Sequence, residues 1–203
     1  SVNAAGSAYE VRPLFDRYRA QRAVYALDLP GFGTSARDDR RYTARLMTDA
    51  VQLATQAIRA RHEGARIDAL ALSLSSEFLA RAASEQPGSY RSLALISPTG
   101  FNRGAPFLGP PEANRGMPWL HWLFSKPPWR QAFFRLLTSE RSMRYFLAKT
   151  WGSPHIDEGL LRYDRLLAAQ PGARFAPYSF VSGFLFSADI TRIYESLQLP
   201  VWM

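Results

Sequence analysis

Two short apolar segments on either side of a helical pattern constrain the fold of this chain most. Residues 66–73 (RIDALALS) and 92–98 (SLALISP) are predicted strands, and residues 75–86 between them have the pattern of a helix. Strands joined through a helix form a right-handed crossover, so these two are expected to be parallel. Their near-continuous apolarity favours coverage on both faces. The predicted fold class is therefore α/β, a mostly parallel sheet with helices on both faces.

The neighbouring segments extend this alternation. Residues 22–31 (RAVYALDLPG) are β-rich and end in a Pro-Gly turn signal, which predicts a further strand. Residues 43–61 have apolar side chains near helical spacing, and Thr43 is a suitable N-cap. Near the end of the chain, residues 188–198 predict a short helix capped by Asp189, and residues 199–203 (LPVWM) predict the start of one more buried strand.

The middle of the chain has a different character. From residue 100 to residue 187 the sequence is rich in Pro, Trp and Phe, has helical spacing, and shows no alternation of strand and helix. We therefore expect residues 1–99 to form the first part of an α/β core, residues 100–187 to be an inserted helical module, and residues 188–203 to return to the core.

Composition excludes several classes of function. The net charge of +8 comes almost entirely from arginines that are spread along the chain without a dense basic cluster, and such charges usually solvate helix faces, so no nucleic-acid partner is expected. The chain has no cysteine, hence no disulfide, thiolate metal site or cysteine nucleophile. The segment GFGTS (residues 31–35) lacks the lysine of a phosphate loop, so no nucleotide or other cofactor is expected.

The chain has no targeting or membrane signal that we recognise. Its first ten residues, SVNAAGSAYE, have neither a charged nor an apolar signal region, and no apolar run approaches the length of a membrane span. We expect a cytoplasmic protein without stable membrane insertion. The opening residues also suggest that an element before them is missing.

Ser73 lies where a predicted strand turns into a predicted helix, which is the arrangement of a nucleophile elbow. The flanking positions, Ala71 and Ser75, are small, as this tight turn requires, although neither is glycine. A serine at a helix N-terminus can attack a carbonyl, and the backbone N–H of Leu74 can then stabilise the oxyanion. Two alternatives stay open. The first is that the serines simply cap the helix. The second is that Ser75 is the nucleophile, but the bulky Glu77 would then occupy a position that needs a small residue.

The segments around this turn resemble the α/β-hydrolase fold superfamily, in particular serine hydrolases of the esterase type with a helical cap. The resemblance covers nearly the whole chain. Residues 67–83 resemble the elbow strand and its helix, and residues 92–101 resemble the next strand. Residues 24–35 (VYALDLPGFGTS) match the family pattern D-x-P-G-x-G-x-S at all its fixed positions, which are Asp28, Pro30, Gly31, Gly33 and Ser35.

The resemblance implies further parts of a site. The family takes a second oxyanion-hole donor from a loop after an early strand, and the backbone N–H of Val2 falls at that place. The acidic member and the histidine of the triad come after later strands, so the resemblance places them beyond Met203. It therefore implies a central segment that lacks both ends and is itself inactive or nearly so.

The three histidines of the chain offer no convincing base. His62 lies near the end of a predicted surface helix, and His121 lies in an aromatic helix where packing is the simpler role. His155 neighbours Asp157 and Glu158, but after Pro154 these residues predict a helix start rather than a metal site. No metal is expected.

The sequence therefore predicts a serine hydrolase that cleaves an ester or related acyl bond through an acyl-enzyme on Ser73. The aromatic residues of the helical module are typical of a packed core; as a cap they would favour a small, largely apolar substrate. A serine at the elbow argues against the family's dehalogenases and epoxide hydrolases, whose nucleophile is a carboxylate. The alternative is a non-catalytic member that binds a ligand or a protein, since a fold alone does not establish a function.

Overall fold

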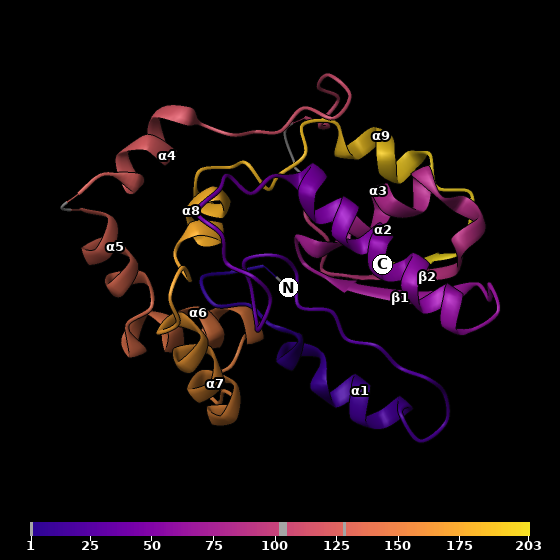
Figure 1. Ribbon diagram of the computed structural model, residues 1–203, viewed down its shortest axis with the longest axis horizontal. Coiled ribbons are helices and arrows are strands. Elements are labelled where there is room, and N and C mark those ends of the chain that lie inside the picture. The colour runs from indigo at the N-terminus through magenta and orange to yellow at the C-terminus, as the bar shows by residue number, and fades with distance from the viewer. Residues whose placement is uncertain (1, 102–104, 128) are drawn as a thin grey trace. The chain divides into compact units, whose positions relative to one another are not determined.

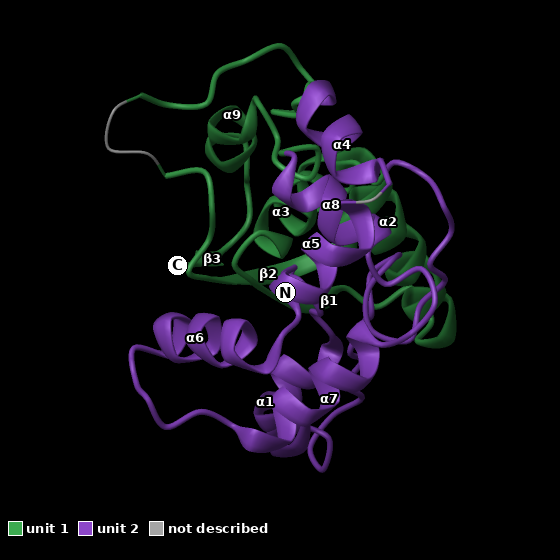
Figure 2. Ribbon diagram, turned by 90° about the vertical axis from the view of Figure 1, so that its left-hand side faces the viewer, with its two compact units in different colours: residues 1, 42–117, 183–203 green, residues 2–41, 118–182 purple. Residues whose placement is uncertain are grey.

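The computed structural model of the chain describes residues 2–101, 105–127 and 129–203, which divide into two compact units (Figure 2). Unit 1 consists of residues 42–117 and 183–203 together with residue 1. Unit 2 consists of residues 2–41 and 118–182. Each unit is formed by segments that are far apart in the sequence.

Unit 1 contains a parallel sheet. Its strands are β1 (Ile67–Leu72), β2 (Tyr90–Ile96) and β3 (Val201–Trp202), in the order β1-β2-β3 (Figure 1). Ala71 is paired with Leu95, and Leu93 is paired with Val201. The strands predicted at residues 66–73, 92–98 and 199–203 are thus confirmed, as is their parallel direction.

The helices of unit 1 are α2 (Ala44–Arg61), α3 (Ser75–Glu85) and α9 (Ile190–Glu195), and a short 3₁₀ turn, η2 (Pro87–Ser89), follows α3. Thr43 caps α2 as predicted, because its hydroxyl accepts a hydrogen bond from the N–H of Leu46 at 3.2 Å. The apolar core between the helices and the sheet is made by Ala71, Leu79, Ala82, Ala83, Tyr90, Leu93 and Leu95. Leu70 and Ile96, in contrast, remain 41% exposed.

A buried ion pair joins α3 to the start of α9. Arg81 donates to Asp189 Oδ1, and the two side chains are only 6% and 4% exposed. The second carboxylate oxygen, Oδ2, accepts a hydrogen bond from the N–H of Glu112 at 3.0 Å. Asp189 occupies the predicted N-cap position of α9, but its side chain makes no capping bond there. Its carboxylate neutralises a buried arginine instead.

The strand predicted at residues 22–31 is not formed. Residues 23–29 have no regular secondary structure, and Tyr25 and Leu27 are each 46% exposed. A β-rich composition reflects how well a segment fits a pleated, half-buried surface, so it yields a strand only where a neighbouring strand pairs with it. Among the residues described, no strand pairs with this segment.

Unit 2 is helical in the residues described. It contains η1 (Ala8–Val11), α1 (Arg12–Tyr18), α4 (Pro118–Ser125), α5 (Trp129–Leu137), α6 (Glu140–Trp151), α7 (Glu158–Ala168) and α8 (Phe175–Val181). Asp157 starts α7, since its Oδ1 accepts from the N–H groups of Gly159 at 2.7 Å and Leu160 at 3.0 Å. This confirms the helix-start interpretation of the segment around His155.

The aromatic residues of unit 2 divide into a packed group and an exposed group. Phe124 stacks on Phe133 with 4.3 Å between the ring centroids, and Phe134 and Tyr178 are buried against them. The exposed group includes Tyr18, Tyr25, Trp119, Trp122, Trp129, Tyr145, Phe146 and Trp151. Within the described ranges, no helix combines the length and the hydropathy needed to cross a bilayer.

Asp164 is a buried carboxyl group in α7. It is 3% exposed, and its Oδ1 has no hydrogen-bond partner among the described residues. Burial, together with the negative charge of Glu10, raises the pKa of Asp164 to about 8. The folded protein therefore keeps this proton up to about that pH, whereas the unfolded chain releases it near pH ~4.

This difference predicts that the free energy of unfolding falls as the pH rises from about 4 to about 8, because the unfolded state binds fewer protons in that range. One proton gives a slope of up to about 1.4 kcal/mol per pH unit. Asp164→Asn should flatten the slope, which denaturant unfolding at a series of pH values measures. Asp16→Asn, at an exposed site of the same unit, should leave it as in the wild type. Equal slopes for wild type and Asp164→Asn would show that Asp164 is ionised in the folded protein.

Candidate active site

The candidate site is the turn between β1 and α3. Strand β1 ends at Leu72, α3 begins at Ser75, and only Ser73 and Leu74 lie between them. Ser73 has a φ of +56°, in the left-handed region that is unfavourable for residues other than glycine. Its backbone N–H donates to the carbonyl oxygen of Ile96 in β2 at 2.8 Å. The turn is therefore held by the sheet in the sharp conformation that the sequence predicts.

The small residues on each side of Ser73 lie in tight surroundings. Ala71 is 7% exposed, and the hydroxyl of Ser75 is buried without a hydrogen-bond partner among the described residues. The N-cap position of α3 is Leu74, with no side-chain capping bond. Neither serine caps the helix, so capping does not explain why serine occupies position 73.

Ser73 and Leu74 present two groups that are free to act on a ligand. The Ser73 hydroxyl makes no hydrogen bond to the rest of the described chain, and the Leu74 N–H donates to no acceptor there. The positive end of the α3 dipole lies at the same place and favours a developing negative charge. A hydroxyl group and a backbone N–H are thus adjacent along the chain, which is the arrangement of a nucleophile elbow.

Glu77 anchors the start of α3 from inside. It is 1% exposed, and its carboxyl group accepts hydrogen bonds from the Thr99 hydroxyl at 2.6 Å and from the Ser187 N–H at 2.8 Å. Burial raises the pKa of Glu77, while these hydrogen bonds oppose the rise. From its place in the sequence, Glu77 was expected only to be too bulky for a turn in which Ser75 is the nucleophile. The buried role of Glu77 was hard to predict, because a glutamate in the first turn of a helix is usually solvent-exposed.

The second motif, residues 28–35, folds a loop of unit 2 around Asp28. One carboxylate oxygen of Asp28, Oδ1, accepts from the Ala8 N–H at 2.7 Å. The other, Oδ2, accepts from the N–H of Thr34 at 2.8 Å and from its hydroxyl at 3.0 Å. The Ser35 hydroxyl donates to the Asp28 carbonyl oxygen at 2.7 Å. These contacts give Asp28 and Ser35 a structural role.

Gly33 is required in this loop by the close approach of Asp28. Its φ is +53°, and a Cβ atom at this position would lie 1.9 Å from Asp28 Cγ. A side chain would therefore displace the Asp28 carboxylate and break its hydrogen bonds. At Gly64, which has a φ of +78°, a Cβ atom would meet nothing within 4 Å.

Gly33→Ala is therefore expected to destabilise the protein more than Gly64→Ala, although both positions have a positive φ. The difference should be about 1.5–3 kcal/mol, the contribution of hydrogen bonds to a charged group. Urea unfolding of the two variants and the wild type measures it. Equal losses would show that the Asp28 carboxylate can leave the loop without cost.

Val2, the other expected site residue, and the three histidines lie in several parts of the chain. Val2 is 4% exposed and belongs to unit 2, whereas Ser73 and Leu74 belong to unit 1. His62 follows the end of α2 and precedes β1. Since β1 has six residues and each adds about 3.3 Å, roughly 20 Å of strand separates that end from Ser73. His62 is therefore no base for Ser73.

The remaining histidines belong to unit 2. His121 lies in α4, and burial followed by the charge of Arg41 lowers its pKa. His155 is exposed, and its N–H donates to the Ser153 hydroxyl at 3.1 Å. The residues that the structure describes contain no group of three His, Cys, Asp or Glu side chains suited to a metal ion.

Several solved structures are similar to this chain. The epoxide hydrolase CorEH is 19% identical, with a TM-score of 0.68 over 97% of this chain and 69% of that protein. Cfl2 from Burkholderia cenocepacia is 21% identical, with a TM-score of 0.63 over 96% of this chain and 66% of that protein. A probable hydrolytic enzyme from Pseudomonas aeruginosa PAO1 is 17% identical, with a TM-score of 0.65 over 98% and 60%. The chain thus spans about two thirds of the length of these proteins.

The family model described as "Alpha/beta hydrolase family" matches residues 2–199, almost the whole chain. No curated protein sequence matches the chain. The matched residues contain both the parallel strands β1 and β2 and the strained turn at Ser73 that leads into α3. From this match and this fold, the chain belongs to the alpha/beta hydrolase family.

Proposed function

We propose that this protein is a serine hydrolase that cleaves an ester or related acyl bond, with Ser73 as the nucleophile. The observation that carries the proposal is the left-handed conformation of Ser73, whose φ is +56°, between strand β1 and helix α3. Such a conformation costs about 1–3 kcal/mol in a residue other than glycine, and strained residues of this kind cluster at active sites.

The reaction proceeds in two steps. Ser73 Oγ attacks the carbonyl carbon while a base takes the hydroxyl proton, and the new C–O bond turns the carbonyl oxygen into an oxyanion. The Leu74 N–H stabilises that charge. The alcohol leaves with the proton, and water then hydrolyses the acyl-enzyme. The histidine base is not assigned to any residue of the described chain.

The proposed substrate is a small ester with a largely apolar acyl or alcohol group. Support comes from the aromatic side chains of residues 118–182, several of which are exposed in unit 2. In this proposal residues 100–187 are the helical cap, and its aromatic side chains favour such an apolar group.

The reaction class is tested with three kinds of substrate on the natural full-length protein. Esters of short and medium fatty acids should be hydrolysed, whereas a haloalkane and an epoxide should not, because those reactions use a carboxylate nucleophile and position 73 is a serine. Turnover of the haloalkane or the epoxide without turnover of any ester would overturn the proposal.

A second candidate function is a non-catalytic member of the family that binds a ligand. The observation that favours it is the turn itself, where Ala71 and Ser75 stand in place of the usual glycines. This candidate predicts saturable binding of an apolar ester, measured by calorimetry, with no release of acid or alcohol.

A further inference from the structure

A cavity of about 290 Å³ lies within unit 2. None of the residues that line it belongs to the Ser73 turn. It is bordered by residues 39–41, by α4, by the start of α5, and by the first turn of α8. We call it the arginine pocket, because its lining includes Arg40, Arg41, Arg130 and Arg174. Its volume suits a small ligand.

The charge of this lining is strongly positive. Four arginines face a single carboxylate, that of Asp39. A guanidinium group stays charged at every ordinary pH, so the pocket keeps this excess. Among the described residues, Arg40, Arg130 and Arg174 take part in no ion pair, whereas Arg144 of the same unit contacts both Glu140 and Glu158. Three of the four arginines of the pocket are thus not neutralised by an ion pair within the described part of the chain.

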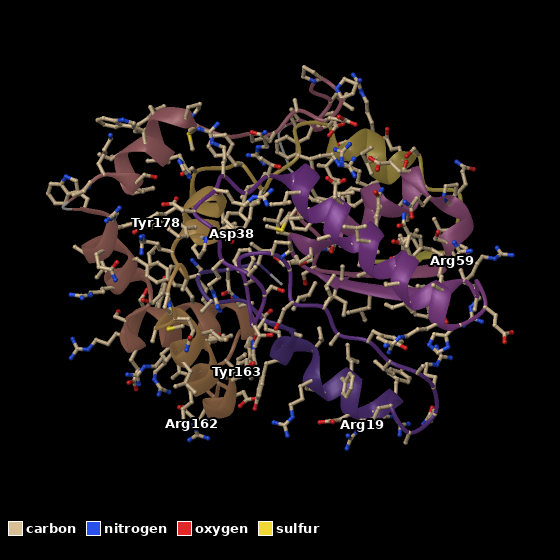
Figure 3. The ribbon with its side chains drawn as sticks, viewed as in Figure 1. Arg19, Asp38, Arg59, Arg162, Tyr163 and Tyr178 are labelled. Atoms are coloured by element: carbon tan, nitrogen blue, oxygen red, sulfur yellow. The ribbon has the colours of Figure 1, made fainter. Side chains whose placement is uncertain are left out.

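Part of the pocket is held in place by packing. Tyr178 is 2% exposed, and its hydroxyl donates to the carbonyl oxygen of Arg130 (Figure 3). The Arg174 guanidinium lies over the Phe175 ring, 4.5 Å from its centroid. Stacking of this kind fixes the plane of the guanidinium and leaves its N–H groups available to a ligand.

We propose that the arginine pocket binds a small anion through a carboxylate or phosphate group. Arginine forms two parallel N–H···O bonds with either group, and several arginines around one cavity provide more donors than the protein itself uses. The anion is either a free small molecule or the charged end of a substrate. This assignment does not depend on the role of Ser73.

The first test titrates the protein with inorganic phosphate at constant ionic strength, with chloride as the replacement salt. Binding is followed by calorimetry and by the NMR signals of the His121 ring, which lines the same pocket. Burial and the charge of Arg41 lower the pKa of His121. A bound anion offsets that charge, so the apparent pKa of His121 should rise in phosphate.

Variants identify the residues responsible. Arg40→Gln and Arg174→Gln should each weaken phosphate binding by about ten- to a hundredfold, as expected for a lost hydrogen bond between charged groups. Arg40 is exposed, so its variant should fold even if the half-buried Arg174 proves necessary for stability. The control, Arg135→Gln, changes an exposed arginine of α5 that does not line the pocket, and should bind phosphate as the wild type does.

The source of the anion is distinguished by competition. If phosphate competitively inhibits hydrolysis of a carboxylate-bearing ester, the pocket takes the charged end of the substrate. If phosphate binds without competing, or if no ester is hydrolysed, the pocket takes a separate anion. The proposal is overturned if phosphate shows no saturable binding at millimolar concentration, or if Arg135→Gln weakens binding as much as Arg40→Gln does.

Discussion

Ser73→Ala is expected to lower ester hydrolysis by roughly 10⁴- to 10⁶-fold, the range found when a member of a catalytic triad is removed. The reason is that alanine has no hydroxyl to form the acyl-enzyme, while the Leu74 N–H and the rest of the turn remain. The loss should appear in kcat. Because the residual rate is small, it is measured as the amount of product that has accumulated when the reaction is stopped after a long incubation.

Ser75→Ala is the matched control for that experiment. Its hydroxyl is buried without a partner in the described chain, and alanine is as small as the turn requires. We expect this variant to keep the activity of the wild type within a few-fold. If Ser75→Ala abolished activity and Ser73→Ala did not, Ser75 would be the nucleophile and the assignment would be wrong.

Asp189→Asn is expected to lower the free energy of unfolding by about 3–5 kcal/mol, because it leaves the Arg81 guanidinium buried without a counter-charge. Arg81 and Asp189 are 6% and 4% exposed, so water cannot replace the lost partner without opening the contact between α3 and α9. Urea unfolding of the variant and the wild type measures the loss.

Two further variants separate the buried charge from the packing around it. Arg81→Met combined with Asp189→Asn should recover part of the stability, since the unpaired guanidinium is then absent. Arg91→Met removes a charge that pairs with Asp68 on the surface, where Arg91 is 63% exposed, and should cost less than about 1 kcal/mol. Similar small losses for Asp189→Asn and Arg91→Met would contradict the structural role given to the buried pair.

The local elements of unit 1 could be predicted from the sequence because their signals are themselves local. The apolar runs of β1 and β2 and the cap at Thr43 each act over a few residues. The strand predicted at residues 22–31 was wrong for the opposite reason. Strand composition alone cannot specify a pairing partner, and this segment has none among the described residues.

The candidate site was predicted only in part. Ser73 could be placed because a strand, a serine and a helix follow one another directly in the sequence. The supports of the turn could not be predicted, because Glu77 contacts Ser187 and Arg81 contacts Asp189 across more than 100 residues. A short sequence pattern carries no information about such contacts. The arginine pocket was missed likewise, since its arginines come from three places that are far apart in the sequence, residues 40–41, residue 130 and residue 174.

The measurement that tests the central claim most directly is labelling of the natural full-length protein with a fluorophosphonate, read by peptide mass spectrometry. This reagent phosphonylates an activated serine far faster than an ordinary one, because an activated hydroxyl is the stronger nucleophile. The proposed function predicts a single modified serine, Ser73, and no modification in Ser73→Ala. Labelling of another serine, or no labelling of the folded protein, would contradict the assignment of Ser73 as the nucleophile.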